Sequence, residues 1–183
     1  MKRVTRDEIL DYVTYTEGRD AIRASAMAAK DLRRVHAGRD LTFLFENRET
    51  VRYQIQEMVR AEHMVRESDI AHELETYNGL LGGPGDLGAT LLIEIEDERE
   101  RAELLRRWVD LPERISLLLE DGRKVPARWD ASQISDGKLS SVQFLLFAVG
   151  DGARPKAVVV EHPDLAVRAD FTEATRRALA ADL

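Results

Sequence analysis

Two glutamates, Glu62 and Glu73, are the residues whose type and spacing point to chemistry. At about 100° per residue, each lies in a helical arc of apolar residues. A carboxylate on such a face is expected to be buried and to have a partner. The apolar residues are Val51, Ile55, Met58 and Val65 around Glu62, and Ile70 and Leu74 around Glu73.

Such carboxylates are consistent with either a structural or a chemical role. In the structural role, Glu62 pairs with Arg48, Arg66 or a basic residue elsewhere, and Tyr77 donates a hydrogen bond to Glu73 one turn away. In the chemical role, Glu62 is a general base or metal ligand whose pKa is raised by desolvation. The sequence leaves both roles open, and with them the question of whether the protein is an enzyme.

A metal site would use the histidines that neighbour these glutamates, His63 and His72. Glutamate and histidine from packed helices bind iron or manganese in helical bundles. The spacing here differs from the Glu-x-x-His of that class, and each imidazole points about 100° away from the neighbouring carboxylate. Glu62, Glu73 and His72 are therefore only the weaker candidates for a metal site, and no cofactor is indicated.

The opposite face of the first helix in this block is polar. Arg52, Gln56 and Arg60 follow one another along it. Such a face is usually solvated, but arginine and glutamine spaced along a helix also form recognition surfaces. These three residues are the candidate partner surface.

Composition narrows the function further. The 183 residues include no cysteine, which excludes disulfides, thiolate zinc sites and cysteine nucleophiles. The net charge of −7 disfavours general binding to nucleic acid or anionic membranes, and RNA binding through the arginines is the weakest hypothesis. No apolar run approaches the ~20 residues of a membrane span, and no secretory signal is recognisable, so we expect a cytoplasmic protein.

The elements that must position these residues follow from caps and periodicity. The sequence predicts a single α+β domain over residues 1–183, with N-terminal helices packed on a mostly antiparallel sheet of about four or five strands. The loop from Gly82 to Asp86 separates a helical part (1–82) from a sheet-rich part (86–183). Expected helices cover 6–12, 17–36, 48–66, 69–81, 97–109 and 171–181, and expected strands cover 41–45, 90–96, 115–120, 123–129, 141–149 and 156–161.

Three details of this assignment are specific. Asn47 is the expected N-cap of the helix over 48–66. Asp121-Gly122 predicts a type I′ hairpin, with Pro126 restricting the return strand to an edge or bulge. The segment 141–149 is apolar on both faces and is expected to be a central strand.

Several segments together resemble a known family. They are Phe45–Glu62, His72–Asn78, Ala89–Ile95, Val125–Arg128 and Ser141–Phe144, so the similarity covers nearly the whole chain.

This set resembles a bacterial domain-of-unknown-function family, number 3501. Members of that family are encoded near rubrerythrin-like and iron–sulfur oxidoreductase proteins, so the resemblance implies an accessory role in redox or peroxide metabolism. It carries over no catalytic residue. Arginine is common in the family at the position of His63, which weakens this histidine as a ligand.

The resulting hypothesis is a cytosolic accessory protein that binds a partner, with a redox enzyme as the implied partner. The alternative is a metal-binding protein or enzyme that uses Glu62 and Glu73 as buried carboxylates.

Overall fold

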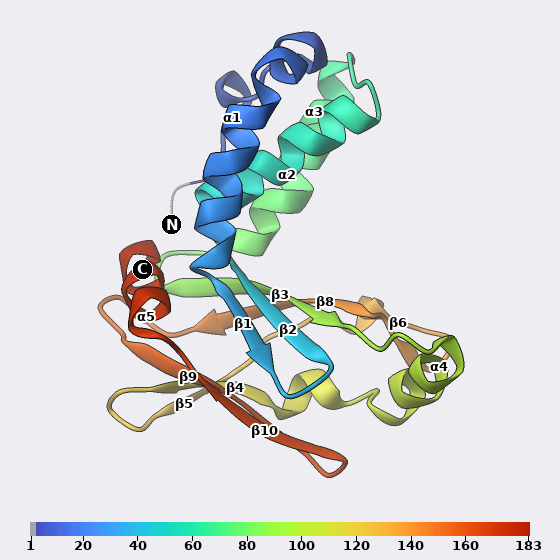
Figure 1. Cartoon of the computed structure of the whole chain (residues 1–183), viewed down its shortest axis with the longest axis vertical. Helices are drawn as coiled ribbons and strands as arrows, with labels where there is room; N and C mark the ends of the chain where they lie inside the picture. Colours follow the sequence, from blue (N-terminus) through green and yellow to red (C-terminus); the bar gives the residue numbers. More distant parts are fainter. Residues whose placement is uncertain (1–2) are drawn as a thin grey trace.

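The computed structural model describes residues 3–183, which form five α-helices and antiparallel sheets (Figure 1). The helices are α1 (Tyr12–Asp31), α2 (Arg48–Ala61), α3 (Glu67–Asn78), α4 (Glu98–Arg107) and α5 (Glu173–Asp182), with short 3-10 turns η1 (Arg6–Glu8), η2 (Gly79–Leu81), η3 (Leu111–Arg114) and η4 (Ala131–Gln133). The strands are β1 (Arg34–Ala37), β2 (Leu41–Glu46), β3 (Asp86–Ile93), β4 (Ile115–Leu119), β5 (Lys124–Pro126), β6 (Ile134–Ser135), β7 (Lys138–Leu139), β8 (Val142–Ala148), β9 (Pro155–His162) and β10 (Leu165–Asp170).

The strands form two four-stranded antiparallel sheets, in the orders β1-β2-β3-β8 and β10-β9-β4-β5, and β6 and β7 form a small hairpin. Arg128 pairs with Leu146 of β8 and so links the edges of the two sheets. One hydrophobic core contains side chains from both sheets, because alternate residues of each strand face inward. Its members include Phe43, Leu91, Leu117, Phe147 and Val158.

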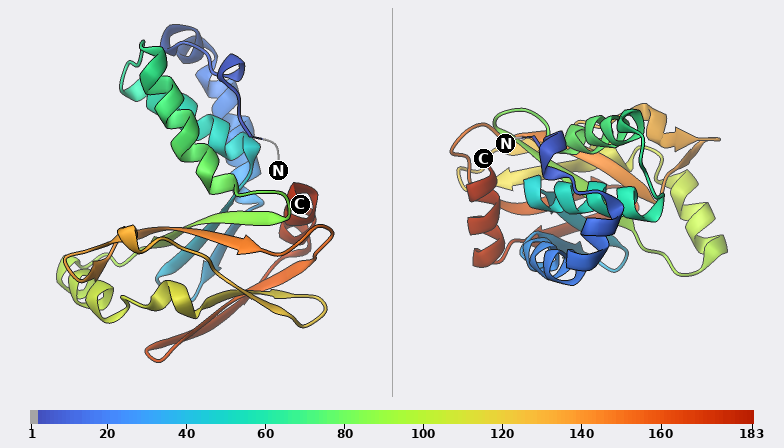
Figure 2. Two further views of the ribbon diagram at one scale, coloured as in Figure 1. Left: turned by 180° about the vertical axis from the view of Figure 1, so that it is seen from behind. Right: turned by 90° about the horizontal axis from the view of Figure 1, so that it is seen from above.

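Helices α1, α2 and α3 project from the sheets as a separate bundle, with α5 and α4 at opposite ends of the sheets (Figure 2). A second, smaller core holds the bundle together, formed by apolar faces of α2 and α3 at helical spacing. Helix α1 leads from the bundle into β1, and after β2 the chain returns to the bundle as α2 and α3 before it enters β3. The bundle is therefore connected to the first sheet at each of these points. The core of the bundle consists of Val4, Ile9, Val51, Ile55, Val59, Ile70, Leu74 and Leu81.

The α+β class and the antiparallel pairing are confirmed. The part of the chain that was expected to be helical also contributes strands to the first sheet. Helix α1 ends at Asp31, and β1 covers residues 34–37, of which 34–36 were expected to be helical. Val35 and Ala37 are buried and pair with β2. Gly38, at φ +69°, makes the turn between the two strands. Residues 3–82 therefore contain β1 in addition to β2, whose strand was expected.

One strand prediction was wrong: residues 141–149 were expected to form a central strand. Strand β8 lies at the edge of its sheet, and Val142 and Phe144 on its outer face are exposed. Strand β10, which was not predicted, pairs with β9 along its whole length. At the 121–122 turn only Gly122 has a positive φ, +89°, so the turn is not the expected type I′. Pro126 does lie on an edge strand, as expected.

The lengths and compositions of the helices can be compared with what a membrane span requires. Among residues 3–183, none of the helices combines the length and the apolar character that crossing a membrane requires.

Candidate functional site

Glu62 is exposed, contrary to the expectation of a buried carboxylate. Helix α2 ends at Ala61, and His63 takes a positive φ of +49° that turns the chain toward α3. The apolar arc therefore stops one turn early, and Val65 is 74% exposed. Glu73 is half-buried, and among residues 3–183 its side chain makes no hydrogen bond or ion pair.

The expected partners of these glutamates have other contacts. The Arg48 guanidinium pairs with the Glu8 carboxylate instead of Glu62. Arg66 is exposed at the N-cap of α3. Tyr77 packs against the bundle core. The structure therefore separates the predicted polar core site into unrelated contacts.

The two histidines do not join these glutamates in a metal site. His72 is exposed, and His63 stacks on Tyr12 with 5.1 Å between ring centroids. Over residues 3–183, no three histidine, aspartate or glutamate side chains are grouped so that they could hold a metal ion.

The predicted partner surface on α2 is covered at its centre. Gln56 is 3% exposed, because its amide accepts from Leu10 N at 2.9 Å and donates to Leu10 O at 2.8 Å. Arg52 and Arg60 are half-buried on either side of it. The segment before α1 therefore occupies the face that was expected to meet a partner.

A closed polar cluster joins α1 to α2 instead. The Glu57 carboxylate accepts from Arg19 at 2.8 and 2.9 Å and from the hydroxyl of buried Tyr15 at 2.6 Å. The Arg19 hydrogen bonds are the main reason that the pKa of Glu57 falls to about 2. Burial raises the pKa of Tyr15, so its hydroxyl remains a donor. All three groups are satisfied by one another, which indicates a structural role.

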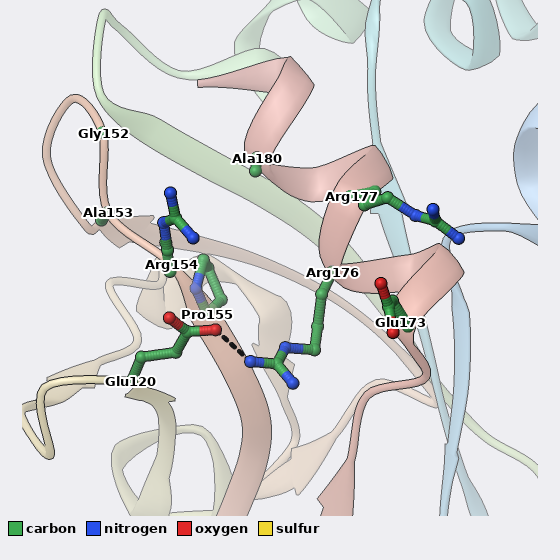
Figure 3. A pocket seen from close by; sticks show the side chains of 9 residues that line it. All are labelled: Glu120, Gly152, Ala153, Arg154, Pro155, Glu173, Arg176, Arg177 and Ala180. Atoms are coloured by element: carbon green, nitrogen blue, oxygen red, sulfur yellow. Dashed lines mark hydrogen bonds and ion pairs between the residues drawn. The ribbon is translucent and has the colours of Figure 1, made fainter.

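An open hollow lies beneath α5, where this helix meets the end of β4 and the loop before β9 (Figure 3). Its volume is about 600 Å³. Arg176 is ion-paired with Glu120 inside it. We call it the arginine pocket; its lining residues are Glu120, Gly152, Ala153, Arg154, Pro155, Glu173, Arg176, Arg177 and Ala180.

The arginines of this pocket differ in direction and in pairing. Figure 3 shows Arg154 on the same side as Glu120 and Pro155, whereas Arg177 points away from them. Within residues 3–183, the Arg154 guanidinium makes no hydrogen bond or ion pair. No pattern in the sequence indicated this site, because residues 120, 154 and 176 come from three separate segments.

A second hollow, of about 480 Å³, lies between the base of the bundle and the outer face of β8. Phe144 is 44% exposed there, and Trp129 and Leu80 also line the hollow. We call it the aromatic groove; its lining residues are Gly79, Leu80, Arg128, Trp129, Asp130, Ser132, Gln133, Phe144, Leu145 and Leu146.

Polar contacts hold the walls of the aromatic groove in place. The Gln133 side chain accepts from Phe144 N at 2.5 Å and donates to Phe144 O at 3.2 Å. Arg128 donates to Asp86 at 2.8 Å. Hydrogen bonds from Ser132 lower the pKa of Asp130, which stays ionised. The groove therefore has a fixed backbone with aromatic side chains and a polar rim.

Comparison with known proteins supports the resemblance seen in the sequence. Residues 3–183 match the family model described as protein of unknown function, DUF3501. A crystal structure at 1.90 Å, described as a novel protein of unknown function from Burkholderia pseudomallei K96243, is 35% identical in sequence. The similarity covers 100% of both chains with a TM-score of 0.89. No curated protein matches the chain. The chain therefore belongs to the family of proteins of unknown function DUF3501.

Proposed function

We propose that this protein is a cytoplasmic accessory protein that binds a partner protein through the aromatic groove. The observation that carries the proposal is Phe144, which is 44% exposed beside a hollow of about 480 Å³. Aromatic side chains, Phe among them, are enriched in the cores of protein–protein interfaces. We therefore place the proposed contact with the partner at Phe144 and not at the α2 residues that the sequence had indicated.

Burial of apolar surface would drive the association. Fully burying a Phe side chain contributes about 1.5–3 kcal/mol. Phe144 is 44% exposed, so covering it contributes about half of that, and Trp129 and Leu80 extend the apolar area. Gln133 forms hydrogen bonds with both main-chain groups of Phe144 and so fixes the backbone of this strand edge. A backbone that is already fixed loses less conformational entropy when a partner binds. The complementary partner is an apolar or aromatic segment.

A rubrerythrin-like or iron–sulfur oxidoreductase is the proposed partner. This part of the proposal rests on the family resemblance alone. It is tested separately from the groove by asking whether the bound protein contains iron.

The test compares partner recovery by the wild-type protein, Phe144→Ser and Val13→Ser. Val13 is a matched control because it is also an exposed apolar residue, at 53%, near the start of α1 and outside the groove. We expect the wild type and Val13→Ser to recover the same protein from cell extract and Phe144→Ser to lose it. Equal recovery by all three would contradict the groove. A partner without iron would contradict only the redox assignment.

A further inference from the structure

We infer that the arginine pocket binds a small organic anion, a carboxylate or a phosphate ester, through Arg154. This pocket and the aromatic groove share no lining residue, so the inference is independent of partner binding. Its volume of about 600 Å³ lies within the range of small-molecule sites, roughly 300–1,000 Å³.

A hydrogen bond fixes the backbone of Arg154, whereas its guanidinium has no partner among the described residues and can bind a ligand. Its carbonyl oxygen accepts from Glu120 N at 2.9 Å, which attaches the loop before β9 to the end of β4. Its guanidinium has no hydrogen bond or ion pair within residues 3–183, and it also lines an adjoining hollow of about 440 Å³. An exposed guanidinium that lines a cavity can donate two parallel hydrogen bonds to an anionic ligand.

The neighbouring acids do not neutralise this charge. Glu120 is engaged by Arg176. Figure 3 shows Glu173 on the far side of Arg176 from Arg154. In the adjoining hollow, Asp121 is ion-paired with Arg123 at 2.7 Å. Asp151 also lines that adjoining hollow and makes no ion pair within residues 3–183. An added anion at Arg154 therefore meets a guanidinium that has no ion-pair partner among these residues, although Asp151 lies nearby and the whole chain carries −7.

The remaining lining residues define the ligand class. A guanidinium binds carboxylate or phosphate oxygens through two parallel hydrogen bonds. Ala153, Pro155 and Ala180 offer contact for a short carbon skeleton. Within residues 3–183, Arg176 contacts one carboxylate oxygen of Glu120, and the other oxygen can accept a hydrogen bond from a hydroxyl group. These features fit a small hydroxylated compound with one anionic end.

The test measures binding affinity by titration calorimetry. The purified protein is titrated with lactate and, separately, with inorganic phosphate, at constant ionic strength in chloride. Arg154→Gln should weaken binding of the preferred anion about tenfold or more, since hydrogen bonds to charged groups are lost. Arg177→Gln is the matched control, because Arg177 lines the same pocket but points away, and it should change affinity less than about twofold.

The two titrations distinguish a carboxylate ligand from a phosphate ligand. Thermal unfolding of both variants should match the wild type, because both side chains are exposed. Absence of binding by the wild type to either anion at millimolar concentration would overturn the inference. Equal affinity of the wild type and Arg154→Gln would overturn it as well.

Discussion

Replacing Glu57 by glutamine should destabilise the bundle strongly at neutral pH and hardly at all in acid. Glu57 is the acceptor for both Arg19 and the buried Tyr15 hydroxyl, and its side chain is 18% exposed. The glutamine amide would keep the shape of the side chain but lose its charge. Arg19 would then lose its ionic partner between α1 and α2.

The magnitude follows from the pKa of Glu57, which is about 2 against an ordinary value of 4.5. At ~1.4 kcal/mol per pKa unit, this difference corresponds to about 3–4 kcal/mol of folding free energy. Arg19 is 30% exposed, so solvent screening reduces the expected loss to about 2 kcal/mol. Because the folded-state pKa is lowered, this stabilisation is present above pH 4.5 and disappears as the pH falls toward about 2.

Urea unfolding at pH 7 and near pH 2 measures the effect. Glu62→Gln is the matched control, since Glu62 is an exposed glutamate at the end of the same helix, and it should change the unfolding free energy by less than about 0.5 kcal/mol. The reasoning would be refuted if Glu57→Gln were no more destabilising than Glu62→Gln at pH 7. It would also be refuted if the difference between Glu57→Gln and wild type were the same at both pH values.

Two further substitutions test the junction between bundle and sheets. Arg33→Met should lower the free energy of unfolding by about 3–5 kcal/mol, measured by chemical denaturation. The reason is that Asp182 stays charged without its ion-pair partner, at a site where both side chains are about 10% exposed or less. Adding Asp182→Leu should restore much of the loss. Gly88→Ala should prevent normal folding, since a β-carbon there would lie 1.6 Å from Leu80 O, whereas Gly79→Ala meets nothing within 4 Å and should leave the thermal midpoint within a few degrees of wild type.

Local signals in the sequence predicted much of the fold. Asn47 accepts from Thr50 N as the N-cap of α2, as its position before an apolar helical pattern indicates. Val51 and Ile55 are buried, as their helical spacing predicts. These features depend on a few neighbouring residues, so the chain encodes them without reference to the rest of the molecule.

The ends of elements depended on tertiary packing. Val35 and Ala37 follow an alanine-rich helix, yet they form a strand because β2 offers them a partner and a buried face. Helix periodicity placed Glu62 on the apolar face of the predicted helix. In the structure α2 ends at Ala61 and the chain turns at His63, so Glu62 is not buried. Gln56 is buried because Leu10, 46 residues away, supplies both of its hydrogen-bond partners.

The candidate sites were decided almost entirely by the tertiary structure. The sequence by itself determined the residue types that are present and most of the helices and strands that carry them. The arginine pocket needs Glu120, Arg154 and Arg176 to meet, and the Glu120–Arg176 pair alone spans 56 residues. Such contacts arise from the packing of α5 against β9 beside β4, because long-range burial, rather than local propensity, sets which distant side chains share one hollow.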